Sequence, residues 1–208
     1  MPSQALVAVA PSEAARLVEA TERILGGPDG GPAARLARHL FERTAEEDLT
    51  ALTAEDLARL ASRALEFLAP SHGDAPRIRI VEETISSGET ITVVETLNDD
   101  MPFLFDSVMG ALVEAGHEIR LVAHPVLPVV RDGAGRLSRL VGAGDPAGRR
   151  ESFIHIHLTR LAGEAARGEL AASLEATLTD VRAAVAAWKT MGNRFGELVG
   201  SSRWGTTP

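Results

Sequence analysis

Residues 90–131 read TITVVETLNDDMPFLFDSVMGALVEAGHEIRLVAHPVLPVVR and predict the order strand, turn, helix, strand. The segment 91–97 is rich in Val, Ile and Thr, which is typical of a largely buried strand. An acidic turn follows, and apolar residues then recur at helical spacing from Leu104 onward. Gly116 stands where a left-handed cap would end the helix, and a second apolar strand begins near Ile119. This unit buries its helix against a sheet, and the rest of the chain is expected to build on it.

The composition excludes several classes of protein. The 208 residues are 45% hydrophobic, which is enough for the core of one large domain or two small ones. There is no cysteine, so a disulfide framework, a thiolate zinc site and a cysteine nucleophile are excluded. The formal net charge of -8 argues against a broad surface for nucleic acid or anionic membrane. Apolar runs fall short of the roughly 20 residues of a membrane span, and no secretion leader is evident, so we expect a cytoplasmic protein.

The flanks of the central unit divide the chain into three parts. Residues 1–70 carry helical patterns separated by Gly and Pro, and they are expected to form a helical N-terminal segment that packs on the domain or on a partner. Residues 77–190 are expected to form the main domain, which ends in a long helix. Residues 191–208 are expected to form a loosely ordered tail rich in Gly, Ser and Thr.

A further strand is predicted at residues 151–161, where alternate side chains face opposite sides of a sheet. The side chains expected to face the helices are Ile154, Ile156 and Leu158. Phe153, His155 and His157 would then lie on the opposite, helix-free face, as a candidate contact surface for a partner. The two histidines lack an acidic or thiolate third ligand, so satisfied or interfacial histidines are favoured over a metal site.

The turn before the central helix is the one site-like feature of the sequence. Its candidate ligand-binding residues are Asn98, Asp99, Asp100, Met101, Pro102, Phe103 and Leu104. Pro102 is expected at the first helical position, and exposed amides at a helix N-terminus can hold a carboxylate. The alternative interpretation is a capped helix start without a ligand. Turn formation and helix electrostatics account for Asp99, Asp100 and Asp106, so no catalytic residue is predicted.

Several motifs in the same order resemble the N-terminal region of the large bacterial NAD-specific glutamate dehydrogenases. The matching residues are Asn98 to Leu104 with Asp106 and Ser107, then His124, Pro125 and Val126, then Glu151, Ser152 and Phe153 with His155 and Ile156. The resemblance covers about residues 30–190 and implies an α+β fold with an ACT-like domain. Such a domain is a ferredoxin-like βαββα antiparallel sheet with helices on one face, here preceded by the helical segment. No clear strand follows the last helix, so the strand at residues 77–82 is a candidate to complete the sheet from the other end.

The same resemblance implies a function. The chain would be a non-catalytic regulatory and assembly domain of a large NAD-dependent glutamate dehydrogenase, which converts L-glutamate and NAD to 2-oxoglutarate, ammonia and NADH. The catalytic and NAD-binding segments of that family lie far downstream, so the chain is expected to be a fragment without a cofactor of its own. Its expected partners are the remaining domains and further copies in a homo-oligomer.

ACT domains also suggest an alternative function. They often bind an amino acid beside the turn between the first strand and the first helix, so the alternative is a sensor whose effector lies at Asn98 to Leu104. Domains that do so commonly carry Gly just after the proline of the turn. Phe103 occupies that position here, and its bulk favours the assembly role. A free-standing enzyme is disfavoured because no catalytic constellation is evident.

Overall fold

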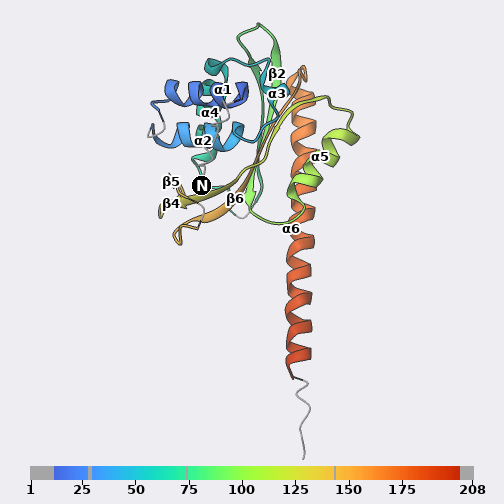
Figure 1. The fold of residues 1–208 in the computed structure, drawn as a ribbon. Helices are drawn as coiled ribbons and strands as arrows, with labels where there is room; N and C mark the ends of the chain where they lie inside the picture. The colour runs from blue at the N-terminus through green and yellow to red at the C-terminus, as the bar shows by residue number, and fades with distance from the viewer. Residues whose placement is uncertain (1–11, 28–29, 74, 143, 202–208) are drawn as a thin grey trace, which may run out of the picture.

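A six-stranded antiparallel sheet lies between two layers of helices in the computed structural model, which describes residues 12–27, 30–73, 75–142 and 144–201 (Figure 1). The strands are β1 (Arg77–Thr84), β2 (Thr90–Asp99), β3 (Ile119–Ala123), β4 (Val126–Arg131), β5 (Leu137–Leu140) and β6 (Arg149–Thr159). The helices are α1 (Glu13–Ile24), α2 (Gly31–Phe41), α3 (Glu46–Leu49), α4 (Ala54–Leu68), α5 (Leu104–Glu114) and α6 (Glu164–Ser201). Within the described ranges, no helix is both long and apolar enough to cross a membrane.

The strand order is β1-β2-β6-β4-β5, and β3 pairs with β6 beside β4. This order and the central β2-α5-β3 unit confirm the predicted α+β, ACT-like fold with an antiparallel sheet. Gly116 has φ 75°, so the left-handed cap predicted after α5 is also present. β1 lies antiparallel to β2 along its whole length, from Arg77 opposite Leu97 to Thr84 opposite Thr90. The strand predicted to complete the sheet from the other end therefore does so.

Because β1 occupies the edge beside β2, α6 does not need to return to the sheet as a strand. It continues as a helix to Ser201, and its second half projects beyond the rest of the fold (Figure 1). The prediction of a loosely ordered tail is therefore wrong for residues 191–201. Glycine costs a helix only about 1 kcal/mol relative to alanine, so the scattered glycines of this stretch do not stop it. Residues 202–208 lie outside the described residues, as do residues 1–11 of the N-terminal segment.

One face of the sheet packs against α5 and α6. Its cluster of buried apolar side chains joins β2 and β6 to both helices. The buried members are Val94, Leu104, Val108, Leu112, Ile154, Ile156, Leu158, Leu170, Leu174 and Leu178. The helix-facing prediction for Ile154, Ile156 and Leu158 is thus confirmed.

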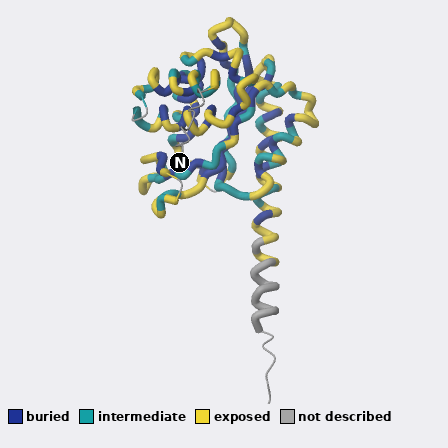
Figure 2. The backbone as a smooth tube through the Cα atoms, viewed as in Figure 1, coloured by how far each residue is buried: buried dark blue, intermediate teal, exposed yellow. Residues whose placement is uncertain are grey.

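The opposite face of the sheet is covered by α1 to α4, and the prediction of a helix-free face is wrong. A second buried cluster joins Phe41 of α2 and Leu60 of α4 to Leu97 and Phe153 of the sheet. Figure 2 shows buried backbone along the strands between the two helical layers. The helical N-terminal segment has a strong apolar stripe of its own, and the nearest large apolar surface that can cover it is this face.

Candidate functional site

The turn between β2 and α5 ends two residues later than the sequence predicts. α5 begins at Leu104, and Phe103 precedes it in the left-handed conformation, with φ 71° and ψ -4°. Pro102 is therefore not the first helical residue. Phe103 is the one non-glycine residue with positive φ in the described part of the chain, and its side chain is exposed, at 56%. A left-handed conformation costs such a residue about 1 to 2 kcal/mol, so the surrounding turn holds it in place.

The two aspartates of the turn are tied to the start of β6. Asp99 Oδ1 accepts a hydrogen bond from Arg149 Nε at 2.8 Å, and Asp100 Oδ2 accepts one from Arg150 Nε at 2.9 Å. The backbone N–H of Asp100 also donates to the carbonyl of Arg150 at 3.1 Å. Both carboxylates are thus engaged in ion pairs with arginines that follow them by 50 residues in the sequence.

Asn98 differs from the rest of the turn because its side chain is fully buried and has no hydrogen-bond partner among the described residues. It lies opposite Ser152, whose hydroxyl is hydrogen-bonded to His124 Nε2 at 2.9 Å. The His124 ring in turn stacks on Phe105 of α5, with ring centroids 4.8 Å apart. A buried amide without a partner costs about 1 to 3 kcal/mol, so Asn98 carries an unsatisfied donor and an unsatisfied acceptor inside the fold.

The remaining predicted residues of the turn have mainly packing roles. Leu104 is buried in the α5 and α6 core, and Met101 packs against the same cluster. Thr96 was not predicted, although its hydroxyl is also buried without a partner, two residues before Asn98 on the same face of β2. The sequence offered a signal for it, since a threonine and an asparagine at alternate positions share one face of a strand. The side chains of Thr96 and Asn98 thus have no hydrogen-bond partner among the described residues, whereas the two aspartates of the turn are paired with arginines.

The predicted contact residues Phe153, His155 and His157 are buried beneath α1 to α4 and form no exposed surface. The two histidines belong to a line of hydrogen bonds. Arg79 Nε donates to Glu95 Oε2 at 2.6 Å, and Glu95 Oε1 lies 3.0 Å from His155 Nδ1. His155 Nε2 lies 2.9 Å from His157 Nε2. Glu95 was missed by the sequence reasoning, although a carboxylate inside the apolar run VVETL is a signal of such a partner.

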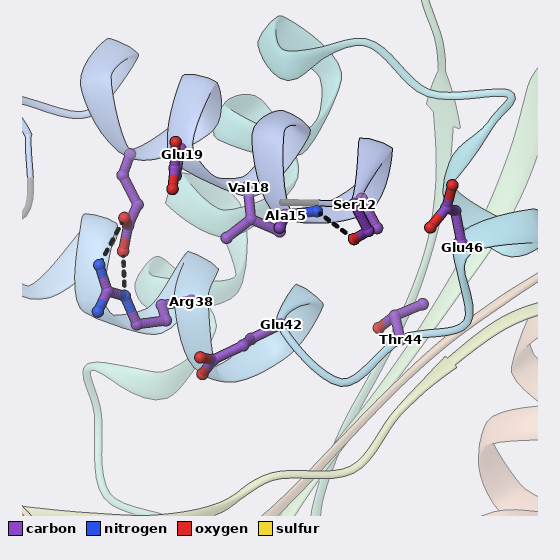
Figure 3. A pocket seen from close by; sticks show the side chains of 10 residues that line it. Ser12, Ala15, Val18, Glu19, Arg38, Glu42, Thr44 and Glu46 are labelled. Carbon is purple, nitrogen blue, oxygen red and sulfur yellow. Dashed lines mark hydrogen bonds and ion pairs between the residues drawn. The ribbon is translucent and has the colours of Figure 1, made fainter. Parts of the chain in front are cut away.

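Two cavities border the layer formed by α1 to α4, and they differ in their lining residues. One, of about 410 Å³, lies along α1 and α2 and has an acidic lining that includes Glu19, Glu42 and Glu46 (Figure 3). The basic residue of this lining, Arg38, is paired with Glu22 through hydrogen bonds of 2.5 and 2.7 Å. The other, of about 380 Å³, opens beside His157. No group of three or more His, Asp or Glu suited to a metal ion occurs within the described ranges.

Comparison with known proteins agrees with this architecture. A family model described as glutamate dehydrogenase, ACT1 domain, matches residues 36–174, which include α4, the complete sheet, α5 and the first part of α6. The chain is 32% identical to an NAD-specific glutamate dehydrogenase of Halomonas elongata over 159 residues, which are 74% of this chain and 10% of that protein. It is 28% identical to an NAD-specific glutamate dehydrogenase of Pseudomonas aeruginosa over 168 residues, which are 78% of this chain and 10% of that protein. No solved structure matches.

The two relatives are much longer than this chain. The aligned part of the chain spans about a tenth of the length of each relative. The family model covers 139 of the 208 residues, counted from 36 to 174, and thus well over half of the chain. The chain belongs to the family of glutamate dehydrogenase ACT1 domains.

Proposed function

We propose that this chain is a non-catalytic regulatory and assembly domain of a larger, cytoplasmic NAD-dependent glutamate dehydrogenase. The observation that carries the proposal is the ACT1 family match combined with relatives about ten times longer than the matched segment. The parent enzyme would convert L-glutamate and NAD to 2-oxoglutarate, ammonia and NADH. NAD would be bound by parts of the parent outside this chain.

The geometry supports a role in assembly. The carboxylates of Asp99 and Asp100 are engaged by arginines, so they are poorly placed to move protons in a reaction. Trp188 and Met191 are exposed on the projecting half of α6. Exposed large apolar side chains at such a position suit contact with other domains or with a second copy in a homo-oligomer.

The catalytic part of the proposal is tested by measuring NADH formation from glutamate and NAD. The purified chain is expected to give none, whereas the parent enzyme gives a steady rate. Glutamate-dependent NADH formation by the chain alone would overturn the proposal.

The assembly part is tested in the parent enzyme by the double substitution Trp188→Ser and Met191→Ser, followed by analytical ultracentrifugation. We expect a smaller assembly or a less compact subunit. Val113→Ser on α5 is the matched control, because Val113 is equally exposed but lies off the projecting helix. Unchanged sedimentation of the double variant would contradict the assembly role of α6.

The second candidate function is amino-acid sensing at the Asn98 to Leu104 turn. The observation that favours it is the buried, unpartnered amide of Asn98 beside the N-terminus of α5. An α-amino acid carries both a hydrogen-bond acceptor and donors, which is what such an amide and nearby helix amides require.

Titration calorimetry of this chain against the common amino acids and 2-oxoglutarate separates the two functions. A sensor gives saturable heat that disappears in Asn98→Ala and Asp100→Ala but persists in Glu19→Ala, which lies in the other helical layer. A ligand that binds the native state must also raise the melting temperature, so a thermal-shift screen is the independent check. A flat response in both experiments leaves the assembly role alone.

A further inference from the structure

The cavity beside His157, here called the His157 pocket, has an unusual floor. It lies between the α3–α4 segment and the ends of β2 and β3, and its volume is about 380 Å³. Leu52, Ile91 and Leu121 contribute apolar lining, and His157 contributes the main buried polar group. His157 is only 2% exposed, yet it is one of the residues that line the pocket. The pocket therefore ends on an imidazole that the fold has already fixed in place.

The hydrogen bonds behind His157 determine which of its ring nitrogens carries the proton. Glu95 accepts from Arg79, so the carboxylate also accepts from Nδ1–H of His155. With both rings neutral, His155 Nε2 is then an acceptor, and Nε2–H of His157 donates to it across 2.9 Å. This leaves Nδ1 of His157 as a bare acceptor. It has no hydrogen-bond partner among the described residues.

The neutral state of His157 agrees with its surroundings. Burial lowers the pKa of His157 well below 6.5, so its ring is neutral near pH 7. A neutral ring with Nε2 already donating can satisfy Nδ1 only by accepting a hydrogen bond. The pocket thus calls for an occupant with an N–H or O–H donor.

The charged side chains at the rim of the pocket indicate which kind of hydrogen-bond donor the pocket would bind. The rim carries three carboxylates, from Glu47, Asp48 and Glu89, and one guanidinium, from Arg120. Arg120 is paired with Glu89 at 3.0 Å, so the charges of Glu47 and Asp48 remain uncompensated within this lining. Such a rim attracts cations and repels carboxylates and phosphates.

We propose that the His157 pocket binds a small organic ammonium ion, such as a primary amine, whose N–H donates to Nδ1 of His157 while its charge lies near Glu47 and Asp48. The apolar lining accommodates the carbon chain of the amine. This site lies on the α1–α4 side of the sheet, whereas the Asn98 amide lies on the α5–α6 side. The proposal is therefore independent of the function proposed above.

The direct test uses this chain with 15N-labelled histidine and follows the ring nitrogens by NMR. The probe is ethylammonium chloride, and the controls at equal concentration are ethanol and sodium chloride. The expected result is an unprotonated Nδ1 for His157 in the free chain and a saturable change in its chemical shift with ethylammonium only. A protonated Nδ1 in the free chain, or equal responses to ethanol or sodium chloride, would overturn the proposal.

Substitutions test the contributions of the rim carboxylates and of the Nδ1 acceptor to binding separately. Glu47→Gln and Asp48→Asn lie on the surface, and each is expected to weaken ethylammonium binding about two- to fivefold. Glu46→Gln is the matched control, because Glu46 neighbours them on α3 but does not line the pocket, and it should leave the affinity unchanged. Equal losses in all three variants would show a general charge effect and reject the site.

His157→Phe removes the acceptor at Nδ1 and keeps a planar ring at this position. The affinity for ethylammonium is expected to fall about tenfold or more, as for the loss of a hydrogen bond to a charged group. If this variant fails to fold, the free-chain tautomer and the rim variants still decide the outcome. Undiminished binding in folded His157→Phe would reject Nδ1 as the acceptor.

Discussion

The two faces of β6 are equally buried but are built from different chemistry. The face toward α5 and α6 carries only aliphatic side chains along its centre, Ile154, Ile156 and Leu158. The face toward α1 to α4 carries Glu151, Phe153, His155 and His157 in alternation. Polar residues on one face of a strand therefore do not identify that face as open to solvent.

The fold tolerates burial of this polar face because arginines on neighbouring strands pair with the buried carboxylates. Arg79 of β1 pairs with Glu95 of β2, and Arg131 of β4 pairs with Glu151 of β6. Apolar contacts are non-directional, so the α5–α6 face tolerates small shifts. Buried ion pairs are strongly destabilised when one partner is removed, since the other charge remains uncompensated. The two faces should therefore respond differently to substitution.

The largest effect is expected for Arg131→Met. Both oxygens of Glu151 accept hydrogen bonds from Arg131 at 2.7 Å, and the same guanidinium donates to the carbonyls of Leu68 and Ala69 at the end of α4. Removing it leaves the fully buried Glu151 without its hydrogen-bonded arginine and the carbonyl of Leu68 without this donor. We expect the free energy of unfolding to fall by about 3 to 5 kcal/mol in urea titrations.

Arg150→Met is the matched control for that experiment. Arg150 also pairs with a carboxylate, Asp100, but its side chain is 70% exposed. An exposed pair of this kind contributes about 0 to 1 kcal/mol. If the two arginine variants lose similar stability, the argument from burial of the polar face is wrong.

A smaller effect, equal on both faces, is expected from core truncation. Leu174 of α6 and Leu60 of α4 are both buried, in the clusters on opposite sides of the sheet. Each substitution to alanine should lower the free energy of unfolding by about 2 to 5 kcal/mol. Urea unfolding followed by circular dichroism measures both. A negligible loss for Leu60→Ala alone would mean that α1 to α4 are peripheral to the cooperative fold.

Local signals in the sequence predicted much of this fold. The alternation and turn chemistry of residues 90–131 predicted β2, α5 and β3, and the helical patterns of residues 1–70 predicted a helical N-terminal segment. The edge position of β1 also followed, because the sheet otherwise lacked a strand beside β2. These features depend on residues close in the chain, where spacing and conformational preference decide the structure.

The features that escaped prediction depend on distant pairs or on local strain. Glu95 meets His155 across 60 positions, and Arg131 meets the carbonyl of Leu68 across 63. No pattern within a single strand specifies such partners, so the sequence alone predicts an open polar face where the structure has a covered one. The left-handed Phe103 was also missed, since this conformation is unfavourable for an aromatic residue and only its surroundings impose it.

Substitution of Asp56, in the first turn of α4, should lower the free energy of unfolding by an intermediate amount that depends on pH. Burial raises the pKa of its carboxyl, but hydrogen bonds from Thr53, Ser86 and Arg59 outweigh burial and hold the pKa below 3.8. A depressed pKa stabilises the fold above the unfolded value, and this stabilisation is lost as the pH falls through the folded value. Asp56→Asn is expected to cost about 1 to 2 kcal/mol at pH 7.

The pH series decides whether that cost arises from the charge of Asp56. The difference in unfolding free energy between the original chain and Asp56→Asn should be constant from pH 7 to about 5 and should shrink below about pH 4. Glu55→Gln controls for helix electrostatics, because Glu55 is an exposed carboxylate in the same first turn of α4. A difference that is independent of pH down to 3 would assign the cost to shape alone.

The smallest effect on stability is expected for the substitution of Ser12, the N-cap residue of α1. Ser12 Oγ accepts a hydrogen bond from the backbone N–H of Ala15 at 3.1 Å, but it has no reciprocal bond and is exposed. Ser12→Ala should therefore cost only about 0.5 to 1 kcal/mol, and Ser12→Gly a few tenths. Amide hydrogen exchange should accelerate in the first turn of α1 and stay unchanged in α4. Faster exchange in both helices would mean that α1 and α4 open as one unit, because α1 packs directly on α4.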